Sequence, residues 1–84
     1  MYKIVISNRV EKSLDKIPNH YLLKIKIAIN ELAQYPRPFG CIKLEGSVNS
    51  YRIRVGIYRI IYTIEDDILT VKVVKVDHRS SAYK

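Results

Sequence analysis

The stretch SYRIRVGIYRIIYTI, residues 50–64, decides the fold of this chain. Apolar and polar residues alternate along it with a period of two, which is typical of strands that bury one face. Gly56 interrupts the alternation and indicates a tight turn. The stretch therefore predicts two strands, at about 50–55 and 57–64, and the short turn makes them antiparallel neighbours.

The same period-two pattern extends to both sides of this hairpin. Turns are indicated at residues 46–49 and at the acidic run 65–67, so further strands are expected at about 41–45 and 68–76. Near the start of the chain, residues 2–6 alternate in the same way and predict another strand. Because the turns between the later strands are short, the sheet is expected to be mainly antiparallel.

Helical spacing fills most of the chain before the loop 36–40, PRPFG. Ser7 and Asn8 offer N-cap oxygens to a short helix that ends at Pro18, since proline does not fit a helix interior. From Pro18 to Tyr35, apolar residues recur at steps of three and four and predict a second helix with one core-facing stripe. The fold class is therefore α+β: an N-terminal strand and a helical hairpin packed on a mainly antiparallel sheet of about four further strands.

Length and composition narrow the class of protein. A chain of 84 residues has room for one modest core, so residues 1–84 are expected to form a single domain. The first residues lack the continuous apolar segment of a secretory signal, and no stretch is apolar enough to span a membrane, so a cytoplasmic protein is expected. The single cysteine, Cys41, excludes an internal disulfide and a zinc knuckle.

The charge balance favours a polyanionic partner. There are 15 Lys and Arg residues against 8 Asp and Glu, which gives a net charge of +7. Binding to phosphates releases condensed counterions, so nucleic acid is the first partner to consider. The alternative is that the basic surface serves solubility alone.

Three arginines are expected to converge on one face of the hairpin. Arg52 and Arg54 point to the same side of their strand because side chains alternate across the pleat, and a tight turn brings Arg59 within reach. Like charges this close repel unless an anion lies between them, and phosphate fits the paired donors of a guanidinium group. The alternative is that these arginines face solvent or pair with carboxylates, the candidates being Glu45, Glu65 and Asp77.

The last predicted strand leads to residues that suit RNA chemistry. His78, Arg79 and Tyr83 are expected just beyond the edge of the same sheet. Histidine titrates near neutral pH, and tyrosine stacks on a base or moves a proton. Lys72 adds charge to this site. The carboxylates of residues 65–67 have no histidine at ligand spacing, and no glycine-rich phosphate loop is present, so neither a metal nor a cofactor is expected.

The stretch KLEGSVNSYRIRVGIYRIIYTIEDDILTVKVVKVDHRSSAY, residues 43–83, resembles the RelE/ParE toxin superfamily, and the preceding strand, helices and PR-containing loop agree with it. The resemblance to RelE-type toxins implies a metal-independent endoribonuclease that cleaves mRNA, usually in the ribosomal A site. In that reaction the 2′-hydroxyl of one nucleotide attacks the adjacent phosphate and leaves a 2′,3′-cyclic phosphate and a 5′-hydroxyl.

The resemblance also implies roles for individual residues. Arg59 and Arg79 would stabilise the charge on the phosphorane, and Tyr83 would stack on a base. Arg52 and Arg54 would position the RNA backbone.

One departure from the family pattern leaves the proton transfer open. The best-known RelE toxins carry lysines at the positions of Arg52 and Arg54, and arginine cannot serve as a base near neutral pH. Either His78 moves the proton, or a slower enzyme relies on the arginines and Tyr83.

Two functions other than mRNA cleavage remain open. For a toxin of either type, the resemblance also implies a protein partner. A ParE-type toxin inhibits DNA gyrase by protein contact, and a non-enzymatic module would only bind RNA. The implied partner is a RelB-like antitoxin whose acidic and apolar segment wraps the toxin in a hetero-oligomer. Candidate contact surfaces are Tyr35, Phe39 and the outer faces of the two helices, against the alternative that these are ordinary exposed residues.

Overall fold

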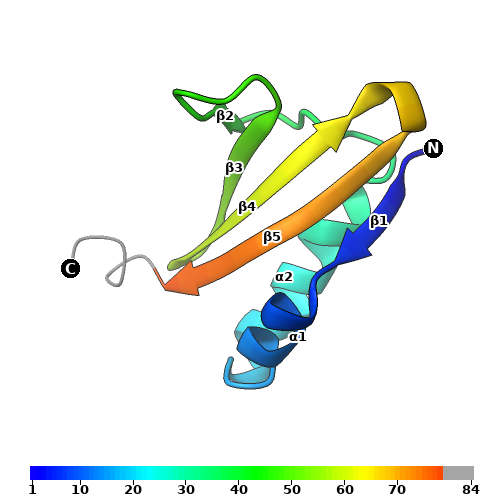
Figure 1. Cartoon of the computed structure of the whole chain (residues 1–84). Helices are drawn as coiled ribbons and strands as arrows, with labels where there is room; N and C mark the ends of the chain where they lie inside the picture. The colour runs from blue at the N-terminus through cyan, green and yellow to red at the C-terminus, as the bar shows by residue number, and fades with distance from the viewer. Residues whose placement is uncertain (79–84) are drawn as a thin grey trace.

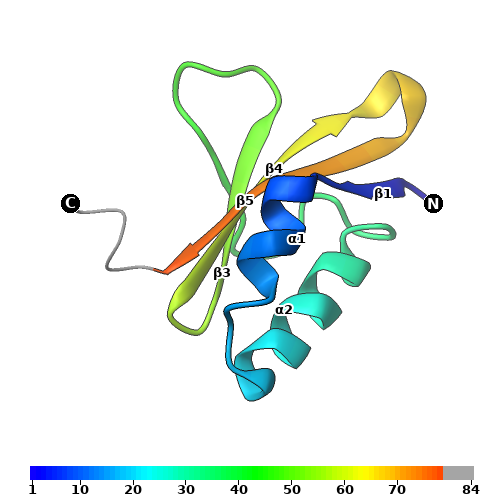
Figure 2. The same ribbon diagram turned by 60° about the horizontal axis from the view of Figure 1, so that its bottom comes forward.

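The computed structural model describes residues 1–78 of the chain. Five strands form one sheet in the order β1-β5-β4-β3-β2, and both helices lie on the same face of it (Figures 1 and 2). The predicted α+β architecture is therefore confirmed. The elements, in chain order, are β1 Lys3–Ile6, α1 Asn8–Leu14, α2 Asn19–Glu31, β2 Ile42–Lys43, β3 Ser50–Val55, β4 Tyr58–Glu65, the 3-10 helix η1 Asp66–Ile68 and β5 Thr70–His78.

The helix ends follow from local hydrogen bonding. Ser7 caps α1, because its Oγ accepts a hydrogen bond from the backbone N–H of Val10 at 3.2 Å. The second helix ends at Glu31, earlier than the expected Tyr35. The next residues continue in tighter turns, in which the N–H of Leu32 donates to the carbonyl of Ile29, and Leu32 stays fully buried. The apolar stripe thus continues beyond the last residue of the helix that it predicted.

The sheet differs from the expectation at both edges. Strand β2 has only the two residues Ile42 and Lys43, instead of 41–45. At the other edge, β1 pairs with β5 in parallel, with Lys3 opposite Thr70, whereas the remaining pairs are antiparallel. The sheet is therefore mainly antiparallel, as predicted, with one parallel pair.

The core lies between the helices and the sheet. Its largest fully buried side chain is Tyr62 of β4, and Val10, Ile25 and Leu32 cover the strands from the helical side. The hydroxyl of Tyr62 donates to the backbone carbonyl of Pro36 at 2.8 Å, so the one polar atom of this side chain has a partner. Burial raises the pKa of Tyr62, which keeps the phenol protonated.

A β-bulge interrupts the alternation of β5. Ile61 lies opposite Lys75, but the next residue, Tyr62, lies opposite Val73, which leaves Val74 as an extra residue. After the bulge Val76 returns to the core, where it is buried. The period of two that the sequence indicated through residue 76 therefore shifts by one at Val74.

The turn between β3 and β4 contains two residues, Gly56 and Ile57. Gly56 has a φ of 60°, a left-handed value that hairpin turns of this length require and that side chains disfavour. This short turn fixes the register in which Val55 lies opposite Tyr58 and Arg54 lies opposite Arg59. The position of the arginines therefore depends on one glycine.

We expect Gly56→Ala to lower the free energy of unfolding by about 1–2 kcal/mol, because an L side chain is strained at this φ. Urea denaturation measures the loss. Gly56→Asn is the matched variant, since asparagine tolerates left-handed φ better and should lose less. An alanine variant as stable as the parent chain would show that the turn tolerates a side chain.

Candidate nucleic-acid interface

The helices leave one face of the sheet open (Figure 2), and the strand register places mainly polar and basic residues on it. Residues directly opposite each other in neighbouring strands point to the same face, so the strand register defines rows across β3, β4 and β5. The rows are Arg54–Arg59–Asp77, Arg52–Ile61–Lys75 and Ser50–Thr63–Lys72. We call these positions the open face.

The structure places three of the arginines singled out above together on the open face. Arg52 and Arg54 are alternate residues of β3, and Arg54 lies directly opposite Arg59 of β4. Within residues 1–78, neither Arg52 nor Arg54 forms an ion pair, and the Nε atom of Arg52 is buried without a hydrogen-bond partner. Because neither guanidinium group has a counterion in the described chain, the pair is suited to bind an anion from outside it.

Arg59 differs from its two neighbours because it has a carboxylate partner. Its Nε lies 3.4 Å from Oδ1 of Asp77, and both side chains are largely buried, with 15% and 13% of their surface exposed. Lys75 reaches the other carboxylate oxygen of Asp77, also at 3.4 Å. Of the carboxylates that the sequence offered as partners, only Asp77 pairs with an arginine in the part of the chain that the structure describes. Pairing with a carboxylate therefore applies to Arg59, and anion binding stays a prediction for Arg52 and Arg54.

Two lysines extend the positive charge along β5. Lys72 was expected at the site, and it lies exposed on the open face opposite Thr63. Lys75 was missed, because strict alternation places it on the buried face. The signal that could have revealed it is the spacing in VKVVKV, residues 71–76, where the two lysines are three apart and the valines between them require an extra residue.

His78 does not join the arginines. It lies opposite Tyr58, whose ring packs against the core, and the two ring centroids are 5.5 Å apart. The ring of Tyr58 in turn packs against the ring of Tyr21 in α2, with 5.4 Å between the two ring centroids. His78 therefore lies on the helical side of the sheet. In this register His78 and the arginines face opposite sides of the sheet, because the bulge at Val74 reverses the faces of the residues after it, and a role of His78 in proton transfer stays a prediction. Arg79 and Tyr83 lie outside the described residues.

A hollow of about 430 Å³ opens beside the arginines, at the β2 edge of the sheet. Arg52 and Arg54 line one part of it, and Phe39, Gly40 and Ile42 line the other. Phe39 and Ile42 are exposed, so apolar surface and positive charge meet in one concave place.

The loop that carries Phe39 is bonded through Arg37 to η1 and to β3. Arg37 forms an ion pair with Asp66 of η1, with Nη2 and Oδ2 2.8 Å apart, and its Nε donates to the hydroxyl of Tyr51 at 3.2 Å. The hydroxyl of Tyr2 donates to the same carboxylate. Arg37 and Tyr2 hold the pKa of Asp66 below its usual range, and Asp66 raises the pKa of Arg37.

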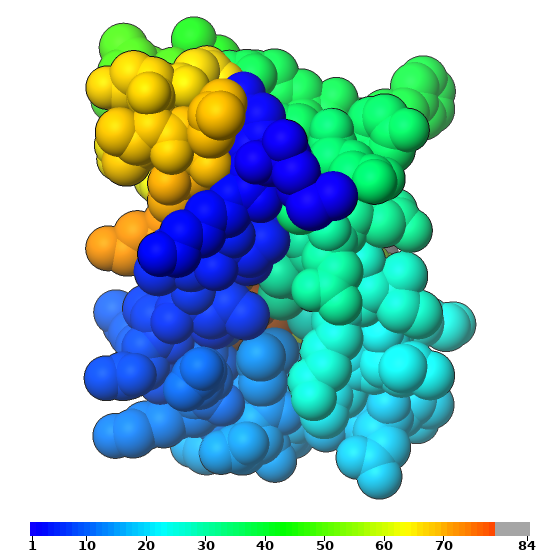
Figure 3. Space-filling view, turned by 90° about the vertical axis from the view of Figure 1, so that its right-hand side faces the viewer, coloured from blue at the N-terminus to red at the C-terminus, as the bar shows by residue number. Residues whose placement is uncertain are grey.

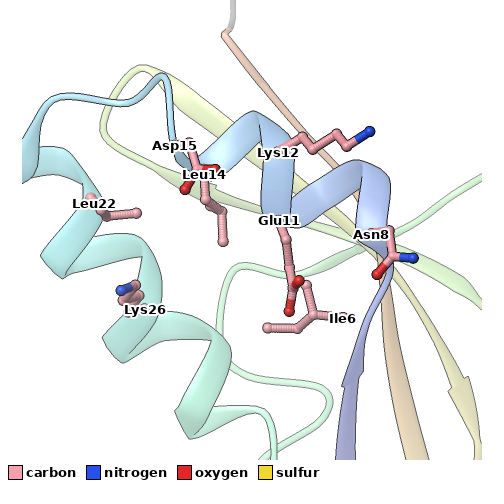
Figure 4. A pocket seen from close by; sticks show the side chains of 8 residues that line it. All are labelled: Ile6, Asn8, Glu11, Lys12, Leu14, Asp15, Leu22 and Lys26. Atoms are coloured by element: carbon pink, nitrogen blue, oxygen red, sulfur yellow. The ribbon is translucent and has the colours of Figure 1, made fainter.

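A second hollow, of about 540 Å³, lies between the two helices (Figures 3 and 4). Apolar side chains of Ile6, Leu14 and Leu22 lie within it, and the charged groups of Glu11 and Lys26 come from opposite helices. It lies on the helical side, apart from the open face, so it is a separate surface.

Apart from the open face and the two hollows, the described chain offers few candidate surfaces or sites. Tyr35 is exposed and lies between α2 and the loop. Residues 1–78 hold no group of three or more His, Cys, Asp or Glu side chains close enough to bind a metal ion. Neither α1 nor α2 combines the length and apolar character of a helix that crosses a membrane.

Comparison with known proteins places this fold and this basic face in a family. Residues 4–83 match the family described as ParE toxin of type II toxin-antitoxin system, parDE. The chain therefore belongs to this family of toxins, within the RelE/ParE superfamily.

Individual relatives carry RelE names. The chain is 34% identical over 86 residues to "Putative toxin RelE1" of Methanocaldococcus jannaschii, covering 99% of this chain and 96% of the relative. It is 27% identical to "Toxin RelG" of Mycobacterium tuberculosis, over 99% of this chain and 97% of that toxin. Among solved structures, an archaeal RelE-RelB complex from Pyrococcus horikoshii OT3 contains a chain with a TM-score of 0.84 and 31% identity, covering 93% of this chain and 94% of that one.

We expect the Arg37–Asp66 pair to make stability depend on pH in the acid range. Folding lowers the pKa of Asp66, so its ionised carboxylate stabilises the fold at neutral pH, and this contribution is lost as the pH falls through the lowered pKa. Asp66→Asn should therefore be less stable than the parent chain at pH 7 in urea denaturation, and the difference should disappear as the pH falls below the lowered pKa of Asp66.

The matched control for this experiment is Asp67→Asn. Asp67 is exposed and forms no ion pair within residues 1–78, so its substitution should leave the pH dependence unchanged. A deficit of Asp66→Asn that stays constant from neutral to acid pH would assign the effect to shape instead of charge.

Proposed function

We propose that this chain is the toxin of a type II toxin–antitoxin module and acts in the cytoplasm as a metal-independent endoribonuclease on mRNA at the ribosome. The observation that carries the proposal is the pair Arg52 and Arg54, two guanidinium groups without a counterion in the described chain, next to a third that is held in place. The RelE names of its relatives support RNA cleavage over the gyrase inhibition of ParE-type toxins.

The geometry suits a division of work among the arginines. Arg52 and Arg54 bind the phosphates on either side of the cleaved bond, because neither forms an ion pair within residues 1–78. Arg59 is oriented by Asp77, so its remaining donors reach a fixed place on the open face, where charge develops on the phosphorane. By resemblance, Arg79 adds a second charge there and Tyr83 stacks on a base.

The reaction breaks the bond between phosphorus and the 5′-oxygen of the next nucleotide. The 2′-oxygen forms a new bond to phosphorus, its proton leaves to solvent or a base, and the departing 5′-oxygen takes up a proton. His78 lies on the other face, so it is not used in this scheme. The alternative that remains is catalysis by preorganised positive charge together with Tyr83.

We expect purified protein to cut mRNA in a translation reaction, with cleavage sites inside codons when mapped by primer extension. Arg59→Ala should slow single-turnover cleavage by about 10²–10³-fold, because it removes a preorganised donor to the phosphorane, and Arg79→Ala should act in the same direction. The ends should be 2′,3′-cyclic phosphates.

Two variants control for charge and for position. Arg9→Ala removes one exposed arginine from α1, on the helical side, and should cleave normally. His78→Ala should keep the pH profile of cleavage between about pH 5 and 8, the range in which histidine titrates. Intact mRNA together with blocked gyrase supercoiling would transfer the function to the ParE-type alternative, and RNA binding without cleavage would leave a binding module.

We also propose that a RelB-like antitoxin binds this chain and forms a hetero-oligomer with it. The solved structures that it resembles include RelE-RelB complexes from Pyrococcus horikoshii and Methanococcus jannaschii. The hollow between α1 and α2 and the exposed Leu23 and Ile27 on the outer side of α2 offer apolar surface for such a partner.

The protein encoded by the neighbouring gene is expected to raise the melting temperature of the toxin. At 100 times its dissociation constant, a partner that binds only the folded state adds about 2.7 kcal/mol, which is a shift of several degrees for a domain of this size. Calorimetry of the mixture measures it. An unchanged melting temperature would exclude that protein as the antitoxin.

A further inference from the structure

Phe39 is a large apolar side chain with no role in the fold. It is fully exposed, whereas every other aromatic ring with a described position except Tyr35 is at least partly covered or contacts another ring. Because it buries no surface, it contributes nothing to the hydrophobic core. It borders the hollow that Arg52 and Arg54 also line.

Hydrogen bonds and an ion pair restrain the loop around Phe39. Pro36 accepts a hydrogen bond from the buried Tyr62 hydroxyl at 2.8 Å, and Arg37 is anchored to Asp66. The carbonyl of Pro38 accepts a hydrogen bond from the N–H of Cys41 at 3.1 Å, which closes a turn directly around Phe39. Two prolines also restrict the backbone. A ring on such a loop loses little freedom when it binds a ligand.

We propose that Phe39 is a stacking platform for one nucleobase of the RNA strand whose phosphates bind Arg52 and Arg54. This inference rests on the proposed function and adds to it a base-binding subsite at the β2 edge, distinct from the tyrosine near the C-terminus. Single-stranded nucleic acid combines a flat apolar base with an anionic phosphate, and it binds where aromatic rings adjoin basic side chains.

The hollow fits a nucleotide in size and chemistry. Its volume of about 430 Å³ lies within the range of small-ligand sites, about 300–1,000 Å³. Ile42 is paired with Arg52 across β2 and β3, so their side chains lie side by side and the lining of the hollow is both apolar and basic. Neither Arg52 nor Arg54 has a counterion within residues 1–78, and Arg54 is exposed, so a phosphate could pair with this positive charge. An added Cβ at Gly40 would meet nothing within 4 Å.

The same features favour RNA over a protein contact at this place. An apolar partner segment would cover Phe39 but would remove water from the guanidinium groups of Arg52 and Arg54, which have no counterion within residues 1–78. A nucleotide offers a flat base to the ring and a phosphate to the positive charge. Contact with the antitoxin is therefore the competing outcome of the test.

The experiment uses a short RNA that cannot be cut because its nucleotides lack the attacking 2′-hydroxyl, with one base replaced by fluorescent 2-aminopurine. Stacking on Phe39 should quench the fluorescence when the wild-type protein is added. Phe39→Ala should weaken binding by roughly tenfold and remove most of the quenching, whereas Phe39→Tyr should preserve both. Tyr35→Ala is the matched control, since Tyr35 is exposed nearby but does not line the hollow.

Each outcome decides the matter. Phe39 is exposed, so its variants should fold, and circular dichroism checks this. Equal quenching and affinity in Phe39→Ala, or no binding of the oligonucleotide to the wild type, would overturn the inference. Normal RNA binding with weakened antitoxin binding would also overturn it and assign Phe39 to the protein partner. If quenching depends on Phe39 while mRNA stays uncut in translation reactions, the subsite stands and the nuclease proposal fails.

Discussion

The single extra residue at Val74 is the constraint on which both faces of the sheet depend. Strand β5 lies between β1 and β4, so its side chains must complete the core on one face and the open face on the other. Without the bulge, Val76 would face solvent and Lys75 and Asp77 would face the helices. Burying a valine stabilises the fold by about 1.5–3 kcal/mol, and burying unpaired charges costs more than that. The bulge places Val76 in the core and keeps Lys75 and Asp77 on the open face.

The same displacement determines the electrostatics of the open face. It brings Asp77 opposite Arg59 and Lys75 beside them, so the most crowded arginine receives a counterion. Arg52 and Arg54, one strand further out, receive none within residues 1–78. The repulsion among three guanidinium groups is thereby reduced without a carboxylate from the described chain neutralising the two that line the hollow. Such an asymmetry leaves positive charge available for an anion.

Local patterns predicted the parts of this structure that depend on local rules. Alternation around Gly56 predicted β3, β4 and the proximity of Arg54 to Arg59, since a two-residue turn leaves one register. The face of His78 and the role of Lys75 could not be predicted in the same way, because one unpaired residue reverses every later position. The contact of Arg37 with Asp66 joins segments far apart in sequence, and a single chain gives no pattern for such pairs.

The parallel pairing of β1 with β5 also sets the order in which this molecule can be completed. Synthesis makes β1 first, yet its neighbour in the sheet consists of residues 70–78, which emerge from the ribosome after every other described element. Until then β1 has no strand to join and Arg59 has no Asp77 to orient it. The open face is therefore not yet assembled while the chain is being synthesised. The ribosome has translated the message through residue 78 before the described fold can form.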